Sequence, residues 1–523
     1  MHHKSILFII AIILLVGGFV LNDQMKVAPV GNEPYAVPSK EVVLADGATY
    51  EMVASYVTKN ISGKPVRMLA YNGMIPGPSI TVLEGAQVTV NFVNNTDMPT
   101  LLHSHGIRME NPYDGTHLVQ KDILPGESFQ YILKFLDPGV FWYHPHVRED
   151  IQQNMGLYGN FVVRAKDQNF WAKADREHLL FLSDVLMENG DIAPYSDKYV
   201  THALMGRFGN TLLINGDTAL ALEAKSGEVH RMFITNGATV RPFNFRIKGA
   251  KMKLVGGDGG RYERETFVDS VVISPSERFV VDVLFDKAGE YAMENAVPGG
   301  KTYVLGKITA TGVPVEGAGT TFQVLRTNEA ETKLFAGFRQ YLPRAPEKRL
   351  ILTLSMDMNK IMSQMMGGGG MGMNHDMTGG QGMGSDMMHA PAPIEWEDAM
   401  GDMNTFSTSD TVTWVMRDEE TGKENMDIKW ELPRGPFVKI RITNDEKSGH
   451  PMQHPIHFHG NRFVVLSVNG VPNDNMVWKD TTLLQTGDVL DMLLETTNPG
   501  KWMAHCHIAE HMHSGMMIAY TVE

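Results

Sequence analysis

Residues 504–516 read AHCHIAEHMHSGM and contain the only cysteine of the 523-residue chain. A thiolate, an imidazole and a weak thioether are the ligands of a mononuclear type 1 copper, provided that a second histidine comes from elsewhere. In an extended strand, successive side chains point to opposite faces. Cys506 would therefore face one way while His505 and His507 face the other, so this one strand could carry electrons between two metal centres.

Composition limits the functions that need to be considered. A chain of 523 residues predicts several domains, because single hydrophobic cores stop growing at about 250–300 residues. The net charge of −14 argues against nucleic acid and anionic surfaces as partners. One cysteine excludes an intrachain disulfide framework, so cysteine pairing gives no information on the redox compartment. We expect a monomer with small-molecule partners.

Residues 1–25 are predicted to be an export signal or an N-terminal anchor. Lys4 precedes an unbroken apolar run over residues 6–16, which matches the roughly 7–15 residues of a signal-peptide core. No small-x-small cleavage site follows, so an uncleaved anchor is the alternative, although the run falls short of the roughly 20 residues that span a bilayer. We expect an exported protein that acts in the periplasm or at the outer face of the cell membrane.

From residue 42 onward the sequence predicts an all-β protein. Short β-branched runs, such as ITV at 80–82 and QVTVNFV at 87–93, alternate with Gly, Pro and Asn turn signals. This spacing is typical of β-sandwiches. We divide the chain into domains at 42–166, 177–328 and 345–523. Paired histidines occur only in the first and third, so the middle domain is expected to space the outer two and let them meet.

Four His-x-His pairs carry most of the functional argument: HSH at 103–105, HPH at 144–146, HFH at 457–459 and HCH at 505–507. Residues i and i+2 of a strand share a face and lie about 6.6 Å apart, so the two imidazoles of a pair can bind different metals of one cluster. A single pair could be two core histidines. Four pairs give eight imidazoles, enough for three copper ions, and His454 can complete the Cys506 site.

These motifs resemble those of the multicopper oxidases over nearly the whole chain. YNG at 71–73 and PGP at 76–78 match as well. The resemblance implies three cupredoxin-like Greek-key β-sandwich domains. It also implies four copper ions, one of type 1, one of type 2 and two of type 3, with the last three forming a trinuclear cluster between the first and third domains.

The resemblance further implies a ligand for each copper. For type 1 copper these are His454, Cys506, His511 and an axial Met516, with Met512 and Met517 as rival axial candidates. Type 2 copper would be bound by His103 and His457. One type 3 copper would take His105, His144 and His507, and the other His146, His459 and His505.

The activity implied by the resemblance is the oxidation of a reducing substrate by single electrons, four of which reduce O₂ to two waters. Because this reduction consumes protons, a carboxylate relay is expected near the cluster. Asp114 matches an acidic position that the family uses in this way, and its alternative role is a turn residue before Gly115. A second acid often follows the last type 1 histidine directly. That position is Met512 here, so Glu510 or His513 could take its place.

Residues 356–403 form a second unusual stretch, with 13 methionines. We predict a mobile, low-complexity Met/Gly-rich insertion in the third domain, because glycine dilutes the methionines and no strand alternation is present. Thioethers select Cu(I), so this insertion could bind additional labile copper. The alternative is an inert flexible loop.

The insertion resembles the methionine-rich segment of the bacterial copper-tolerance oxidases, or cuprous oxidases. That resemblance implies Met356, Met358 and Met452 as ligands of the substrate copper, and Met452 could pass an electron to the type 1 site. The chain departs from the group at two acidic positions, which are His450 and a residue near Ile361 here.

Three functions follow as hypotheses. The first is an exported oxidase of Cu(I) that protects against copper. The second is a laccase-type oxidase of phenols or other organic reductants, with the same copper ligands. The third is a non-catalytic copper carrier, which would have no need of a trinuclear cluster.

The variant Cys506→Ser should lose the blue colour and the oxidase activity completely, because the chain has no second thiolate. The eight paired imidazoles remain, so the variant should still bind copper in the cluster. Absorption spectra and copper analysis check both statements, and a variant that stays blue would rule out the assignment of Cys506.

Overall fold

The computed structural model describes residues 24–25, 30–313, 317–367, 392–435 and 437–523. The predicted export segment lies outside the described residues except for Gln24 and Met25, and the residues 368–391 of the insertion also lie outside them. Among the described helices, none combines the length and the apolar character that crossing a membrane requires.

Strands far outnumber helices in the described structure, which confirms the predicted all-β class, and residues 41–164 form the first two large sheets. The five-stranded sheet has the order β2 (Glu41–Val43), β5 (Ser79–Leu83), β10 (Gly159–Arg164), β9 (Gly139–Pro145) and β7 (Leu102–His105). The four-stranded sheet has the order β4 (Lys64–Tyr71), β3 (Thr49–Ile61), β6 (Gln87–Asn95) and β8 (Ser128–Lys134). In β6 every second side chain is buried, as the alternating sequence predicts.

Residues 176–311 form the middle two sheets. The six-stranded sheet has the order β15 (Thr211–Ile214), β11 (Arg176–Val185), β17 (Val229–Asn236), β22 (Arg278–Leu284), β19 (Lys251–Gly257) and β20 (Gly260–Val268). The five-stranded sheet has the order β16 (Leu220–Lys225), β24 (Thr302–Thr311), β23 (Gly289–Ala296), β18 (Phe243–Lys248) and β21 (Val271–Ile273). Buried apolar side chains of both sheets form one cluster, as in a sandwich.

Residues 348–522 form the last two sheets. The six-stranded sheet has the order β26 (Val412–Asp418), β25 (Lys348–Met356), β28 (Phe437–Asn444), β33 (Val489–Glu495), β30 (Phe463–Val468) and β31 (Val471–Pro472). The five-stranded sheet has the order β27 (Lys429–Leu432), β35 (Met517–Val522), β34 (Gly500–Cys506), β29 (His454–Phe458) and β32 (Thr481–Leu484). The domain borders at 42–166, 177–328 and 345–523 stay predictions.

Short elements complete the described structure. Two small ladders pair β1 (Gln24–Met25) with β14 (Tyr195–Ser196) and β12 (Met187–Glu188) with β13 (Asp191–Ile192). The α-helices are α2 (Glu149–Gln152), α3 (Glu329–Phe338), α4 (Met358–Gly367), α5 (Asp402–Phe406) and α6 (Ala509–His513). The 3₁₀ turns are η1 (Asn111–Tyr113), η2 (Ala318–Thr321), η3 (Arg339–Tyr341) and η4 (Asn425–Asp427).

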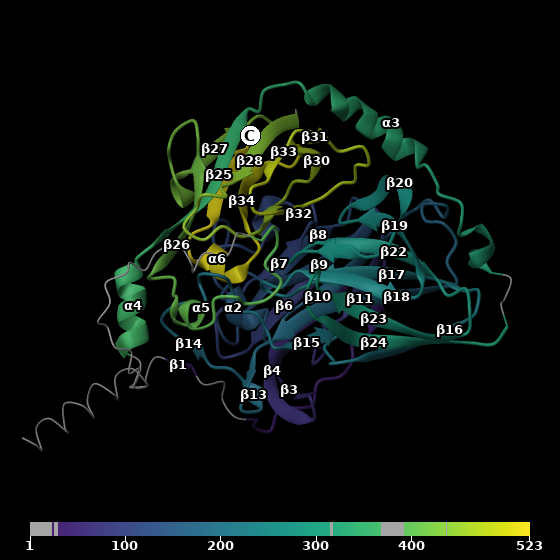
Figure 1. Ribbon diagram of the computed structural model, residues 1–523, viewed down its shortest axis with the longest axis horizontal. Coiled ribbons are helices and arrows are strands. Elements are labelled where there is room, and N and C mark those ends of the chain that lie inside the picture. The colour runs from purple at the N-terminus through teal and green to yellow at the C-terminus, as the bar shows by residue number, and fades with distance from the viewer. Residues whose placement is uncertain (1–23, 26–29, 314–316, 368–391, 436) are drawn as a thin grey trace, which may run out of the picture.

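The first and last segments of the chain meet directly. They share one large cluster of buried apolar side chains, which includes Trp142 from the first segment and Trp414 and Trp502 from the last. In Figure 1 the C-terminal β34 and α6 lie next to β7, and the rings of His103 and His459 are only 4.0 Å apart between centroids. The outer segments therefore build one shared interior, which also includes Phe181 and Val185 of β11, while most buried apolar side chains of the middle sheets form a cluster of their own.

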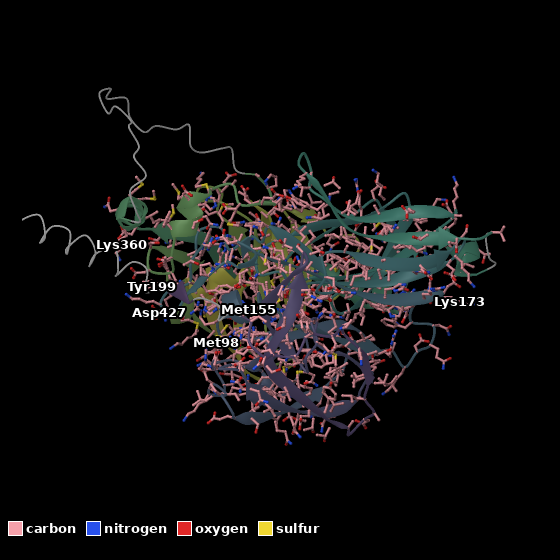
Figure 2. All side chains as sticks on the ribbon, turned by 90° about the horizontal axis from the view of Figure 1, so that it is seen from below. Met98, Met155, Lys173, Tyr199, Lys360 and Asp427 are labelled. Atoms are coloured by element: carbon pink, nitrogen blue, oxygen red, sulfur yellow. The ribbon has the colours of Figure 1, made fainter. Side chains whose placement is uncertain are left out.

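The structure differs from the predicted low-complexity insertion at its start. β25 ends at Met356, and α4 begins at Met358 and continues to Gly367. Asp357 caps this helix, because its carboxylate accepts the N–H of Lys360 at 3.1 Å. Residues 358–366, MNKIMSQMM, contain no glycine or proline, so the helix-poor composition begins only at Gly367. Figure 2 places Lys360 of α4 at one end of the molecule and Lys173 at the other.

Candidate metal centre

Strand register brings the histidine pairs together. β7 and β9 are antiparallel with His103 opposite His144, and β29 and β34 are antiparallel with His457 opposite His505. Opposite residues of an antiparallel ladder share a face, and so do residues i and i+2. Each ladder therefore presents histidines on one face, and the two faces meet where the first and last segments contact each other.

Eight imidazoles form three groups whose ligand atoms lie within 4.8 Å of one another. The groups are His103, His457 and His459; His105, His144 and His507; and His146, His459 and His505. All eight residues are 4% exposed or less. These groups correspond to the sets expected from the sequence, with the addition that His459 also lies beside His103 and His457.

Backbone carbonyls orient the rings of this cluster. The Nδ1–H of His103 donates to the carbonyl of Asp114 at 2.6 Å, and that of His457 donates to the carbonyl of Asp480 at 2.8 Å. His144 and His505 donate in the same way to Pro145 and Cys506, at 2.7 and 2.8 Å. A ring held through Nδ1 presents Nε2 as a bare lone pair, which is how proteins prepare histidines for metal binding.

The bare nitrogens fit a metal cluster. The Nε2 atoms of five of these histidines are buried without a hydrogen-bond partner among the described residues: His103, His144, His146, His457 and His507. The Nε2 atoms of His459 and His505 face each other at 3.0 Å. Buried polar atoms in proteins normally have partners, so this concentration of unpartnered acceptors points to bound cations. Imidazole and thiolate donors together suit copper.

Burial favours the neutral form of several of these imidazoles. It lowers the pKa of His459 and His507 to about 3, and it lowers the pKa of His105, His144 and His505 well below the usual histidine range. A metal ligand has to be deprotonated. These imidazoles can therefore bind metal at neutral pH without first losing a proton.

Cys506 belongs to a separate group on the other face of β34. Its Sγ atom lies 3.6 Å from Nδ1 of His454 and 3.9 Å from Nδ1 of His511, and all three residues are buried. The ring of Trp414 stacks on His511 with centroids 4.1 Å apart and meets the edge of His454. Burial raises the pKa of the Cys506 thiol, so a cation is needed to favour the thiolate.

The register of the last two strands favours Met516 as the axial ligand. His505 pairs with Met517 across the ladder of β34 and β35, so Met517 lies on the face of the histidine cluster. The next residue, Cys506, donates its N–H to the carbonyl of Met516, which places fully buried Met516 on the face of Cys506. Met512 lines a small cavity with Cys506 and with His144, His505 and His507.

The structure places the three expected relay residues in different surroundings. Asp114 touches the cluster, because both of its carboxylate oxygens lie 3.1 Å from Nδ1 of His459. Burial alone would raise the pKa of Asp114, but the charge and hydrogen bonds of His459 and His103 lower it overall. Glu510 is buried with both carboxylate oxygens unpartnered in the described part of the chain, and burial raises its pKa to about 8.

Sequence reasoning missed Glu149, which holds the third expected relay residue, His513. The carboxylate of Glu149 lies 3.0 Å from Nδ1 of His146 and 2.5 Å from Nε2 of His513. It also lines the same cavity as Met512, at the place where an acid after His511 was expected. The available signal was the spacing of three residues between His146 and Glu149 at the start of a short helix, α2.

The three proposed substrate-copper residues have different surroundings. Met452 is fully buried two residues before His454. The methyl group of Met356 lies against Gly449: a Cβ atom built on this glycine would be 3.1 Å from the methyl carbon. Next to Gly449, Nε2 of His450 is buried without a hydrogen-bond partner among the described residues, and burial lowers the pKa of His450 to about 4. Met358 is exposed on the first turn of α4.

Comparisons with known proteins agree with this arrangement. Three sequence models described as multicopper oxidase match residues 53–168, 176–329 and 395–523. Multicopper oxidase MmcO of Mycobacterium tuberculosis is 26% identical over 501 residues, which cover 87% of this chain and 83% of that protein. Copper resistance protein A of Escherichia coli is 23% identical over 602 residues, covering 91% and 93%.

A solved structure has the same fold. It is a multicopper oxidase from Campylobacter jejuni, described as a metallo-oxidase, with a TM-score of 0.65 and 23% identity over 94% of this chain and 98% of that one. The three matched stretches include every histidine of the cluster and the whole Cys506 group. The chain belongs to the multicopper oxidase family and is an oxidoreductase that uses copper.

Proposed function

We propose that this multicopper oxidase oxidises Cu(I) to Cu(II) and reduces O₂ to water, with laccase-type oxidation of phenols as the alternative. Four copper ions would be held by the twelve residues assigned above. His454, Cys506, His511 and Met516 would bind type 1 copper, and His103 and His457 type 2 copper. The two type 3 ions would be bound by His105, His144 and His507 and by His146, His459 and His505.

The balanced reaction takes four Cu(I), one O₂ and four protons to four Cu(II) and two waters. The bound coppers supply the one-electron redox steps. The chain's own residues exclude water, orient the imidazoles and deliver protons. We propose that Asp114 delivers protons, because its carboxylate is buried and in contact with His459.

The single observation that carries the choice of Cu(I) is the covering of the type 1 histidines. His454 and His511 are both buried, and Trp414 lies against both rings. A bulky phenol would need direct contact with an exposed imidazole edge. A small cuprous ion needs only soft donors nearby. His450 and Met452 precede His454 by four and two residues, and the methyl group of Met356 lies against Gly449.

Two further points support the proposal. Copper resistance protein A carries copper resistance in its name, and the solved neighbour from Campylobacter jejuni is described as a metallo-oxidase. Residues 1–21 read as an export segment, so we propose that the protein works outside the cytoplasm, where copper first enters a cell envelope. Additional labile copper would bind the methionines of residues 356–403.

Steady-state kinetics separate the two substrates. The rates of O₂ consumption with Cu(I) and with 2,6-dimethoxyphenol should be compared, each with and without added Cu(II). We expect a much larger kcat/KM for Cu(I), and phenol oxidation that is slow without added Cu(II). Fast phenol oxidation without added Cu(II), together with poor turnover of Cu(I), would favour the laccase alternative.

The variant Met516→Leu should raise the potential of the type 1 copper, because loss of a weak axial donor favours Cu(I). Copper content should stay at the level of the parent. Redox titration of the blue absorption measures the change. The matched control is Met517→Leu, which lies on the other face of β35 and should leave the potential unchanged. If the two variants behave in the opposite way, Met517 is the axial ligand.

Replacement of residues 367–390 by a short Gly/Ser linker should leave folding and copper content intact, because the stretch has no core-forming pattern. If its methionines collect Cu(I), the KM for Cu(I) should rise several-fold or its turnover should fall, while phenols gain access and react faster. A variant with the six methionines of this stretch changed to serine keeps the length and isolates the thioethers. Unchanged Cu(I) kinetics in both variants would leave the stretch as a spacer and favour the organic-substrate laccase.

A further inference from the structure

A turn of the middle segment reaches the histidine cluster. Residues 274–277 connect β21 to β22, and the hydroxyl of Ser276 lies 2.6 Å from Nε2 of His105. Ser276 is fully buried, and its hydroxyl also lies 3.3 Å from the hydroxyl of Thr481 in the third segment. The middle segment, which the sequence suggested as a spacer, therefore contacts both outer segments at the cluster.

The contact makes His105 different from its neighbours. In His103, His144 and His457, Nδ1 is hydrogen-bonded and Nε2 is bare, whereas in His105 Nε2 is the nitrogen in contact with a partner. The Nδ1 atom of His105 is buried without a hydrogen bond in the described structure. A metal-bound histidine donates its other N–H to a second partner, which fixes the tautomer. Ser276 is that partner on Nε2, so Nδ1, which has no hydrogen bond but lies 3.1 Å from a carboxylate oxygen of Asp480, is the nitrogen left for the metal.

The backbone of Ser276 gives a second, independent reason to assign a role to its side chain. Its φ is 77°, in the left-handed region that serine rarely adopts and glycine adopts freely. Such a residue persists where the surroundings over-determine it, and these positions concentrate at functional sites. A glycine here would relieve the backbone and lose the CH₂OH side chain, whose hydroxyl is the only group of Ser276 that can hydrogen-bond to His105.

Arg278 extends the same contact to His457. Its guanidinium pairs with both carboxylate oxygens of Asp480, one of them at 2.7 Å, and also donates to the carbonyl of Ser276 at 3.0 Å. Asp480 in turn accepts the Nδ1–H of His457 through its carbonyl, and one carboxylate oxygen lies 3.1 Å from Nδ1 of His105. Arg278 and Asp480 are buried, so the carboxylate needs this forked partner to stay oriented between two imidazoles.

We propose that Ser276 and Arg278 are positioning residues for the trinuclear copper cluster. Ser276 selects the nitrogen through which His105 binds copper, and Arg278 holds Asp480 and thereby His457. This inference rests on the copper assignments proposed above, but not on the choice of substrate. It gives the middle segment a part in the cluster, because the segment carries both of these residues across to the outer segments.

The decisive variant is Ser276→Gly, because it removes the hydroxyl while relieving the backbone. We expect an unfolding temperature equal to or above that of the parent, and an affinity for cluster copper lowered by roughly 10–100-fold, the usual effect of removing such an outer partner. A type 3 copper that has lost its coupled partner should give a new signal in electron paramagnetic resonance, whereas the blue absorption of the Cys506 site should not change. Ser274→Ala is the control, since that hydroxyl donates to Glu277 at 2.8 Å and not to a histidine.

Arg278→Lys tests the second half of the proposal, because lysine keeps the charge but loses the fork. The matched control is Arg231→Lys on β17, where an equally buried arginine pairs with Asp282 through two contacts of 2.8 Å, in the same sheet. We expect both variants to lose similar thermal stability. Only Arg278→Lys should lose cluster copper and show an altered type 2 signal.

Three outcomes would overturn the proposal. One is a Ser276→Gly protein with the copper content and resonance spectrum of the parent. Another is a loss of cluster copper as large in Ser274→Ala or Arg231→Lys as in the test variants. The third is equal loss of the blue site and the cluster, which would indicate general unfolding. Copper analysis and spectra judge the proposal even if the parent oxidises phenols rather than Cu(I), so failure of the proposed substrate is a separate result.

Discussion

Eight imidazoles meet at one interface, and each has to present a bare nitrogen to that interface. This constraint shapes everything around the cluster. A ring can offer one nitrogen to a metal only if the other is occupied, so every histidine needs an outer acceptor. The chain provides backbone carbonyls at Asp114, Pro145, Asp480 and Cys506, carboxylates at Asp114 and Glu149, and a hydroxyl at Ser276.

The same requirement explains why the cluster lies between segments rather than inside one sandwich. One strand ladder can place four histidines on a face, but a cluster that is closed on all sides needs a second ladder opposite it. The first segment brings β7 and β9, and the last brings β29 and β34. Packing these faces together buries the imidazoles, lowers the pKa of His459 and His507 to about 3, and so keeps the rings unprotonated for metal.

The sequence alone predicted much of this arrangement, because strand periodicity is local. The period of two placed His103 and His105 on one face and separated Cys506 from its neighbours, and the matching pairs pointed to one cluster. It could not reveal Ser276 or Asp480 as partners of His105, because those contacts join positions far apart in the chain. Helix α4 was not predicted, because the helix-poor composition of the glycine-rich stretch was extended to the run before it. That run contains no glycine before Gly367.

The Cys506 group and the histidine cluster differ in the length of the chain loop that has to close before their residues meet. Cys506 and His454 are 52 residues apart and belong to neighbouring strands of one sheet, whereas Asp114 and His459 are separated by 345 residues. By the logarithmic cost of loop closure, the longer connection costs about 2 kcal/mol more chain entropy. During assembly of the chain, the Cys506 pocket can thus form as soon as the C-terminal sheet folds. The cluster can form only after the first and last segments have docked, so we expect it to form late in folding.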